Sequence, residues 1–377
     1  MKLLDIETPA ALIDEARMAG NIARMQDHLT SLGVRLRPHV KTSKCVEVAR
    51  AQQKAGAVGI TVSTLKEAEQ FFAAGFTDVL YAVCIAPDKL DRALALIRKG
   101  CALTLLVDSV TAAEAVVAKG RVADRTLQVM IEIDSDGHRS GVQPEAPELI
   151  EIGKVLQAGG ATVKGVLTHA GSSYDLDTPE ALQALAEQER ALCVRAAERL
   201  RAAGIACPEV SIGSTPTAIA AQNLAGVTEV RAGVYVFFDL VMSNVGVCTP
   251  ANVALSVLTT VIGHQPEKGW VIVDAGWMAM SRDRGTQRQK IDYGYGAVCD
   301  LDGNAIDGLI VSGANQEHGI VSRRDGTADT SLVERFPIGA RLRILPNHAC
   351  ATGAQYPSYL AVTPAGDATP WPRFQGW

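Results

Sequence analysis

Eight short apolar runs alternate with longer amphipathic stretches between about residues 35 and 240. Each run is rich in Val, Ile, Leu or Thr and ends at polar or turn residues, which is typical of buried strands. Strands that alternate with helices favour a parallel sheet, and eight such units favour a closed (β/α)8 barrel. The predicted strands are 35–41, 59–64, 79–83, 103–108, 127–134, 163–170, 209–215 and 229–237.

The clearest predicted helix begins at Asp177-Thr178-Pro179, runs through Ala181–Ala203 and ends at Gly204. A capping residue, a proline in the first turn and a terminal glycine mark its two ends. A doubly wound open sheet is the alternative architecture. Its commonest signal is a GxGxxG motif after the first strand, and the sequence has no such motif there, so the barrel is favoured.

After about residue 245 the pattern changes to long β-type runs, with turns such as Asp302-Gly303 and almost no helical periodicity. This pattern indicates a mainly antiparallel β domain. The strand-like segment at residues 10–13 precedes the first barrel strand and can pair with that domain. We therefore expect a barrel over 14–245 and a β domain made of 1–13 plus 246–377. Its predicted strands are Ala254–His264, Trp270–Ala275, Gly296–Asp300, Leu309–Gly313 and Arg341–Leu345.

Composition excludes several classes of protein. A net charge of −5 over 377 residues, without a dense Lys/Arg run, argues against a nucleic-acid partner. Acidic residues follow the first methionine too soon for a signal peptide, and no apolar run is long enough to span a membrane. The eight cysteines are scattered without CxxC spacing. We expect them to be reduced thiols in a cytoplasmic protein.

In a (β/α)8 barrel the catalytic groups lie at the carboxyl ends of the strands. Lys41 is at such an end, after the apolar residues Leu36, Pro38 and Val40. A solvated surface lysine is the ordinary alternative. A lysine that is carried inward, next to the cations Arg37 and Lys44, would have a lowered pKa and could act as an amine nucleophile. Lys41 is therefore our candidate for forming an imine with an aldehyde.

The ends of the last two predicted barrel strands are expected to bind a phosphate group. The first ends in Gly213-Ser214-Thr215-Pro216-Thr217, at the start of a helix, where backbone N–H groups favour a dianion. The second contains Arg231-Ala232-Gly233-Val234-Tyr235, whose glycine lets the backbone approach a ligand. Helix capping without any ligand is the alternative for the first segment.

Two further strand ends carry candidate residues. His169 begins His169-Ala170-Gly171-Ser172-Ser173-Tyr174 and could act as an acid, a base or a group stacked on a ring, unless it is an ordinary core histidine. Arg139, in Asp136-Gly137-His138-Arg139-Ser140-Gly141, could hold an anionic oxygen.

In the predicted β domain, His348-Ala349-Cys350 places an imidazole and a thiol on one face of an extended segment. This pair suits zinc or another divalent ion. Two protein ligands leave coordination positions open for water or substrate, as a catalytic metal requires. Glu317-His318 and Asp292 are further candidate ligands that the sequence does not place.

The motif Arg37-Pro38-His39-Val40-Lys41-Thr42, Arg139 in its setting, His169–Tyr174 and Pro346–Thr352 together resemble the D-threonine aldolase / D-serine dehydratase family. These are pyridoxal-phosphate enzymes of the alanine racemase fold type, and the resemblance spans nearly the whole chain. Ser43 departs from it, because relatives often carry histidine there.

The resemblance implies that Lys41 forms the Schiff base with pyridoxal 5′-phosphate, that Arg139 contacts its phenolate side and that Tyr174 contacts its ring. It also implies a homodimer, and it favours manganese as the metal, although the thiolate would also suit zinc. The implied phosphate ligands are Gly213, Ser214, Thr215, Gly233 and Tyr235, and the implied metal ligands are His348 and Cys350.

The leading functional expectation is metal-dependent retro-aldol cleavage of a D-β-hydroxy-α-amino acid, such as D-threonine, to glycine and an aldehyde. His169 is the candidate base that removes the hydroxyl proton. The alternative is a D-serine or 3-hydroxyaspartate dehydratase, in which Lys41 takes the Cα proton and a keto acid and ammonia are formed. A non-catalytic pyridoxal-phosphate carrier is disfavoured, because it needs neither the β domain nor the His-x-Cys pair.

Overall fold

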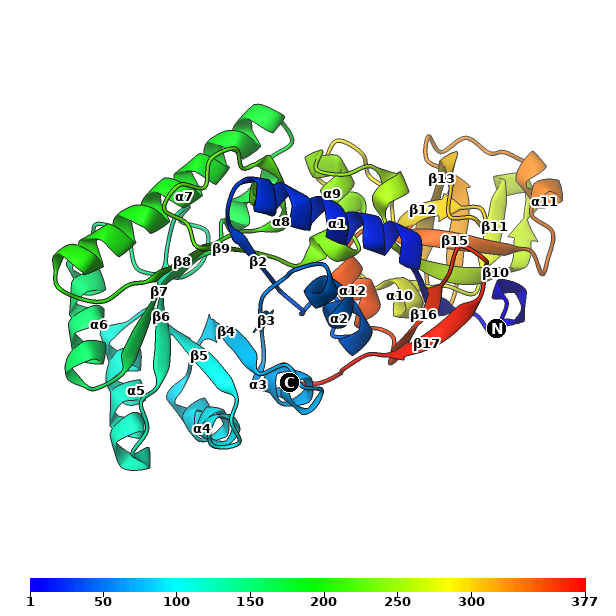
Figure 1. Cartoon of the computed structure of the whole chain (residues 1–377). Coiled ribbons are helices and arrows are strands. Elements are labelled where there is room, and N and C mark those ends of the chain that lie inside the picture. The colour runs from blue at the N-terminus through cyan, green and yellow to red at the C-terminus, as the bar shows by residue number, and fades with distance from the viewer. The chain divides into compact units, whose positions relative to one another are not determined.

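A computed structural model describes residues Met1–Trp377, which divide into two compact units. The barrel unit is Arg24–Gly233 with Gly376–Trp377, and the β unit is Met1–Ala23 with Val234–Gln375. Helix α1 (Glu15–Ser31) begins in the β unit and ends in the barrel unit. In Figure 1 the strands of the barrel unit are coloured from blue to green, and most of the β unit from green to red.

The barrel unit contains eight parallel strands in the order β2-β9-β8-β7-β6-β5-β4-β3. The sheet nearly closes between β2 and β3, where the Val40 N–H donates to the Thr61 carbonyl at 2.9 Å and the Val58 N–H to the Leu36 carbonyl at 2.8 Å. The predicted barrel is confirmed. Its strands are β2 (Arg35–Pro38), β3 (Ile60–Val62), β4 (Asp78–Cys84), β5 (Ala102–Val107), β6 (Gln128–Ile133), β7 (Thr162–Thr168), β8 (Glu209–Ile212) and β9 (Glu229–Ala232).

Helices follow the strands of the barrel unit, and Figure 1 shows α4–α7 beside the parallel strands. Hydroxyl side chains cap four of these helices, since Thr64, Ser109, Thr178 and Ser214 each accept a hydrogen bond from a backbone N–H of the first turn. The helices are α2 (Val46–Lys54), α3 (Leu65–Ala73), α4 (Leu90–Arg98), α5 (Val110–Ala123), α6 (Pro147–Ala158), α7 (Pro179–Ala202) and α8 (Thr215–Ala220).

Four predicted barrel strands, at 35–41, 59–64, 209–215 and 229–237, are shorter in the structure by three residues or more. The strand predicted at 35–41 stops at Pro38, and Lys41 lies in the turn that follows. The strand predicted at 209–215 stops at Ile212, because Ser214 caps α8. The expected burial of Lys41 is wrong, since its side chain is exposed.

The β unit contains a nine-stranded sheet in the order β11-β14-β13-β12-β15-β10-β1-β16-β17, which closes through a further pairing of β11 with β10. All pairs are antiparallel except β1 with β16. The strands are β1 (Ala10–Asp14), β10 (Leu255–Gln265), β11 (Trp270–Val273), β12 (Gly296–Cys299), β13 (Ala305–Ala314), β14 (Gly319–Arg323), β15 (Arg341–Pro346), β16 (Ser358–Val362) and β17 (Ala368–Pro372).

Valine, leucine and isoleucine side chains from these strands form the core of the β unit, for example Val257, Val273, Val298 and Ile344. Its helices are short: α9 (Leu240–Val245), α10 (Trp277–Met280), α11 (Ser331–Arg335) and α12 (Ala349–Gly353). All eight cysteines of the chain are free thiols, as predicted. No helix is both long and apolar enough to cross a membrane.

Candidate functional site

The carboxyl edge of the barrel carries most of the predicted site residues. Arg139, His169, Gly213 and Gly233 follow β6, β7, β8 and β9, and Lys41 follows β2. Because the strands are parallel, their carboxyl ends lie at one edge of the sheet. Lys41 is exposed there, whereas Arg37 is ion-paired with Glu229 and Asp78, and Lys44 with Glu67. The two cations named from the sequence thus have carboxylate partners of their own.

His169 is held as a neutral ring. Its Nδ1 lies 3.1 Å from the Gly213 carbonyl oxygen, which can only accept, so Nδ1 carries the proton and Nε2 keeps its lone pair. Burial, and after it the positive charges of Lys41 and Arg231, lower the pKa of His169 to about 3. The ring of Tyr174 is 6.4 Å away between centroids. A histidine with so low a pKa is a poor proton acceptor near neutral pH.

This pKa predicts a pH dependence of stability. Because the folded-state pKa of His169 lies below its ordinary value of 6.5, the unfolded chain takes up a proton that the folded ring does not. The stabilising contribution is complete above about pH 6.5 and is lost as the pH falls towards about 3. When the pH is lowered from about 7 to about 5, we expect the melting temperature of His169→Asn to fall less than that of wild type. Melting curves of both proteins at each pH measure this difference. An equal loss would contradict the assignment, and the exposed His318→Asn is the control.

The segment after β8 is tightly packed. A Cβ atom on Gly213, whose φ is +128°, would lie 2.3 Å from the Arg231 carbonyl oxygen, so only glycine fits. The Ser214 hydroxyl lies 2.9 Å from that of Ser173 and caps α8 through Thr217. The buried Glu189 carboxylate accepts hydrogen bonds from the N–H groups of Ala170 at 2.9 Å and Gly213 at 3.1 Å, and thereby ties the ends of β7 and β8 together.

The ends of β2 and β9 also approach each other closely. A Cβ on Gly233 would lie 3.1 Å from the His39 carbonyl oxygen and 3.2 Å from the Thr42 hydroxyl. His39 Nδ1 is buried without a hydrogen-bond partner, and burial together with Lys41 and Arg231 keeps the pKa of His39 well below its ordinary value. Arg231 donates to the Ser211 hydroxyl at 2.7 Å and to the Thr168 carbonyl at 2.6 Å.

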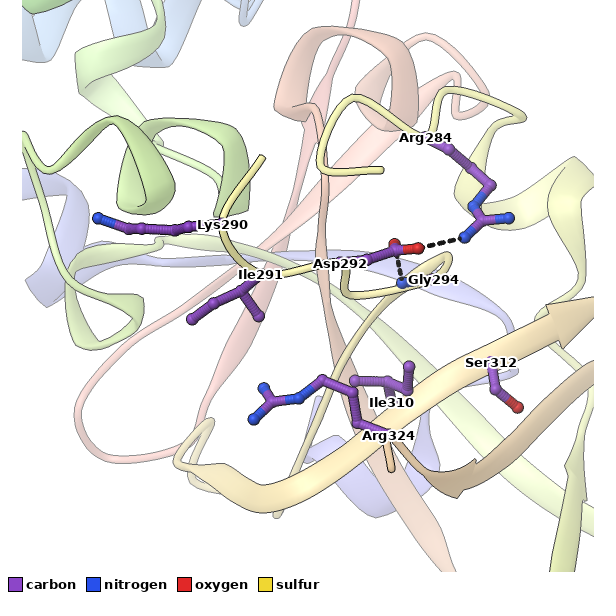
Figure 2. Close-up of a pocket in the computed structure, with 8 residues that line it drawn as sticks. All are labelled: Arg284, Lys290, Ile291, Asp292, Gly294, Ile310, Ser312 and Arg324. Atoms are coloured by element: carbon purple, nitrogen blue, oxygen red, sulfur yellow. Dashed lines mark hydrogen bonds and ion pairs between the residues drawn. The ribbon is translucent and has the colours of Figure 1, made fainter. Parts of the chain in front are cut away.

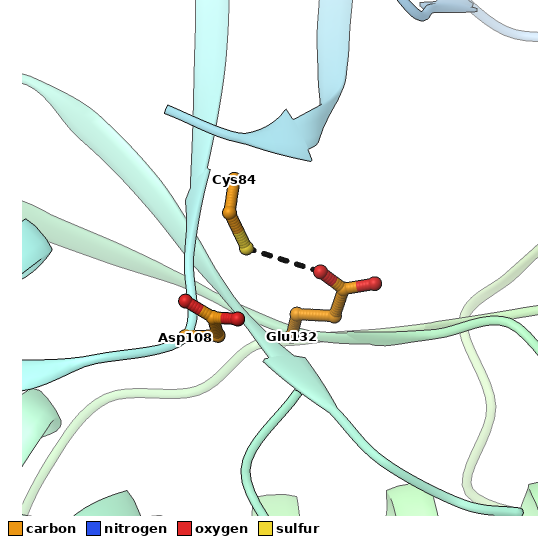
Figure 3. A group of neighbouring side chains, drawn as sticks. All are labelled: Cys84, Asp108 and Glu132. Atoms are coloured by element: carbon orange, nitrogen blue, oxygen red, sulfur yellow. Dashed lines mark hydrogen bonds between the residues drawn. The ribbon is translucent and has the colours of Figure 1, made fainter. Parts of the chain in front are cut away.

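Arg139 is exposed and belongs to a cluster that the sequence did not reveal. Glu132 lies 3.5 Å from its guanidinium and accepts a hydrogen bond from the Cys84 thiol at 3.0 Å (Figure 3). Cys84, Asp108 and Glu132 are close enough to hold a metal. However, burial and the two carboxylates raise the pKa of Cys84 and keep it a thiol, which is not the form that binds metals. These three residues are therefore better suited to supporting Arg139 than to binding a metal.

The predicted metal ligands lie together in the β unit. His348 is the N-cap of α12 and Cys350 is in its first turn, so the expected extended segment is wrong, yet the two side chains are hydrogen-bonded. His348 Nδ1 lies 2.6 Å from an Asp283 carboxylate oxygen. Burial alone would lower the pKa of His348, but the hydrogen bonds with Asp283 and Cys350 outweigh it and raise the pKa to about 11. A metal that binds here must therefore displace a proton.

A second carboxylate supports the same segment. Buried Asp239 accepts hydrogen bonds from the N–H groups of Ala349 and Met242, both at 2.9 Å. Sequence reasoning missed both Asp239 and Asp283, and neither stands in a motif that would mark it. Of the other candidates, Asp292 pairs with Arg284 at 2.8 Å, and Glu317-His318 lies in the exposed turn between β13 and β14.

The residues present fit pyridoxal phosphate and a divalent metal. The barrel edge offers an exposed amine, a buried and unpartnered His39 Nδ1 and two glycine positions that a side chain would fill. In the β unit, a thiol and an imidazole backed by a carboxylate make a suitable donor set for zinc or a similar ion. Tyr235, also predicted to bind the cofactor, is fully buried in the β unit.

Two protein-family models match the chain. The alanine racemase N-terminal domain matches residues 13–241, and the putative serine dehydratase domain matches residues 254–362. Together they account for the barrel and most of the β unit.

Individual relatives are similar over the full length. D-threo-3-hydroxyaspartate dehydratase from Delftia sp. (strain HT23) is 66% identical over 376 residues, which cover 100% of this chain and 99% of the relative. The structure of a Cys→Ala mutant of D-threo-3-hydroxyaspartate dehydratase in the metal-free form matches with a TM-score of 0.99 and 66% identity, and covers 100% of both chains. D-threonine aldolase from Filomicrobium marinum matches with a TM-score of 0.83 and 25% identity, and covers 99% of this chain and 96% of that one.

The matches thus include a dehydratase and an aldolase on one fold, and the dehydratase is far more similar to this chain. The enzymes of this family use pyridoxal phosphate. The chain therefore belongs to the D-threonine aldolase / D-serine dehydratase family of pyridoxal-phosphate enzymes with the alanine racemase fold.

Proposed function

We propose that this enzyme is a dehydratase that converts D-threo-3-hydroxyaspartate to oxaloacetate and ammonia. The observation that carries the proposal is the 66% identity to D-threo-3-hydroxyaspartate dehydratase over the whole chain. Dehydration, the alternative in the sequence analysis, therefore replaces retro-aldol cleavage as the leading function. The carbon–oxygen bond at Cβ breaks in place of the Cα–Cβ bond.

In this proposal Lys41 is the base. Its amine removes the Cα proton and the β-hydroxyl leaves as hydroxide. The resulting enamine takes up a proton at Cβ to become an imine, and hydrolysis of that imine gives the keto acid and ammonia. Pyridoxal phosphate, when bound, supplies the electron sink that makes the Cα proton removable. The exposure of Lys41 at the barrel edge leaves its amine accessible for this role. His169 is a less suitable base because its pKa is about 3.

The other residues of the barrel edge hold the cofactor. Arg139, supported by Glu132, would contact the phenolate oxygen, and the rings of His169 and Tyr174 would contact the pyridine ring. Neutral His169 suits this contact, because it adds no positive charge beside Lys41. The proposed phosphate ligands are Gly213, Ser214, Thr215, Gly233 and Tyr235.

His348 and Cys350 would hold the divalent metal. The Asp283 carboxylate accepts a hydrogen bond from the Nδ1–H of His348 and so leaves Nε2 to bind the ion. The metal would supply a Lewis acid that eases the departure of hydroxide. The thiolate ligand suits zinc, and manganese remains the ion that the family resemblance favours. A homodimer is part of the same proposal.

The test is to identify the products from D-threo-3-hydroxyaspartate. We expect purified enzyme with pyridoxal phosphate and a divalent metal to release oxaloacetate and ammonia in equal amounts, measured by malate dehydrogenase coupling and an ammonia assay. The L-enantiomer, which presents its Cα proton from the opposite side, is the matched control and should not react.

Retro-aldol cleavage is the second candidate, because the match to D-threonine aldolase covers 99% of this chain. On the same substrate it would give glyoxylate and glycine in place of oxaloacetate and ammonia. Detection of glycine as the major product would replace the proposed dehydratase with an aldolase.

A further inference from the structure

A basic pocket lies in the β unit. None of its lining residues was predicted from the sequence to bind the cofactor, and Asp292 was named only as a further candidate metal ligand. Its volume is about 430 Å³, and its walls come from β13, the end of β14 and the loop 281–295. Figure 2 shows Arg284 and Asp292 on that loop, with Arg324 reaching from the strand-formed wall. The lining residues are Arg284, Lys290, Ile291, Asp292, Gly294, Ile310, Ser312 and Arg324.

The charges of the pocket are unbalanced. Three cations and one carboxylate line it, and that carboxylate is already paired with Arg284 at 2.8 Å. Lys290 and Arg324 have no ion-pair partner, and the buried Nε of Arg284 has no hydrogen-bond acceptor. Two uncompensated positive charges and a free guanidinium donor favour a dianion that can accept several hydrogen bonds.

The walls of the pocket are fixed before any ligand arrives. The buried Asn347 side chain donates to the Gly294 carbonyl at 2.7 Å, and Asn244 donates to the Ile291 carbonyl at 2.8 Å. The Asp292 carboxylate accepts a hydrogen bond from the Gly294 N–H at 2.8 Å. Tyrosine rings lie against two of the cations, Tyr295 at 5.5 Å from Arg284 and Tyr293 at 5.9 Å from Arg324. A site that is ordered in advance loses little entropy on binding.

We propose that this pocket binds a small dicarboxylate anion. That a dianion binds follows from the charges; the choice of a dicarboxylate rests on the proposed function, whose substrate and product both carry two carboxylates. Planar carboxylates match the paired donors of an arginine, and an unbranched chain of four carbons fits a volume of about 430 Å³. The pocket would thus give the enzyme a binding site for molecules of its own substrate class.

The experiment is calorimetric titration of the holoenzyme with succinate, which has two carboxylates but no amine and no hydroxyl and cannot react. We expect Arg324→Ala to weaken succinate binding by about tenfold or more, the usual effect of losing a hydrogen bond to a charged group. Lys290→Ala should also weaken it. Arg323→Ala is the matched control, because it removes the same charge from the adjacent residue, which does not line the pocket, and it should change the affinity by less than about twofold.

Equal succinate affinity in wild type and Arg324→Ala would overturn the site. Binding of inorganic phosphate without binding of succinate would overturn the dicarboxylate class. The product assay is independent of this titration. If the product assay detects no oxaloacetate while succinate binding still depends on Arg324, the dehydratase proposal is wrong and the anion-site proposal is supported. If the assay detects oxaloacetate but succinate does not bind, only the anion-site proposal is wrong.

Discussion

Replacement of Lys41 by alanine is expected to abolish turnover and to remove the visible absorbance of bound pyridoxal phosphate. The side-chain amine is the group that would tether the cofactor and take the Cα proton. The methyl group of alanine can do neither. Loss of a positioned general base alone lowers rates by about 10²–10⁴-fold. Absorbance spectra of the purified variant and the oxaloacetate assay measure the two effects separately.

Two further variants separate the amine from its charge and its surroundings. Lys41→Arg keeps a positive charge but offers no amine, and should be as inactive as Lys41→Ala. Lys54→Ala removes an exposed lysine at the end of α2 in the same unit and should keep both colour and activity. Turnover by Lys41→Ala at the wild-type rate would remove Lys41 from the mechanism.

The barrel could be predicted from the sequence because burial of its strands and helices produces a regular pattern of apolar residues. Parallel strands are covered on both faces, so each one is a short, nearly continuous apolar run such as 103–108, and the helices between them are amphipathic. The cap at Thr178 and the proline after it placed the start of α7 within Asp177-Thr178-Pro179, and the helix begins at Pro179. The ends of the strands were less predictable, because buried residues of types common in strands, such as Val40 and Thr215, continue past them into the turns.

The β unit was predictable where its strands are long and apolar. β14 and β17 were missed, since Gly319–Arg323 is short and half polar, and Ala368–Pro372 contains two prolines, which are tolerated in an edge strand. β16 was missed as well, although Ser358–Val362 is mostly apolar.

The candidate metal site could be predicted only in part, because some of its contacts join residues that are far apart in the sequence. His348 and Cys350 are two positions apart and form a recognisable pair, whereas Asp283 and Asp239 contact the segment from 65 and 110 residues away in sequence. No local pattern records such long-range contacts. Similarly, the residues alone could not decide between cleavage of the Cα–Cβ bond and loss of the hydroxyl, because both reactions use an amine, an electron sink and a metal.

Replacement of His348 by alanine is expected to remove the metal and the activity but leave the cofactor in place. The imidazole is one of only two predicted protein ligands, and even the loss of a residue that merely supports a ligand costs about 10–100-fold in affinity, so removal of the ligand itself should cost about 100-fold or more. Metal content after dialysis, measured by atomic absorption, is expected to fall from about one ion per chain to a trace. The visible absorbance of pyridoxal phosphate should match that of wild type, because Lys41 is intact.

Chelation and two variants complete the test of the metal site. Treatment of wild type with EDTA should reproduce the loss of activity, and added metal should restore wild type but not His348→Ala. Cys350→Ala should behave like His348→Ala, since the two side chains are hydrogen-bonded partners. His318→Ala, which alters an exposed histidine of the same unit, should keep its metal. If His348→Ala retains one tightly bound ion, the metal is held elsewhere, and the Cys84–Asp108–Glu132 cluster, whose thiol would then have to ionise, becomes the next place to look.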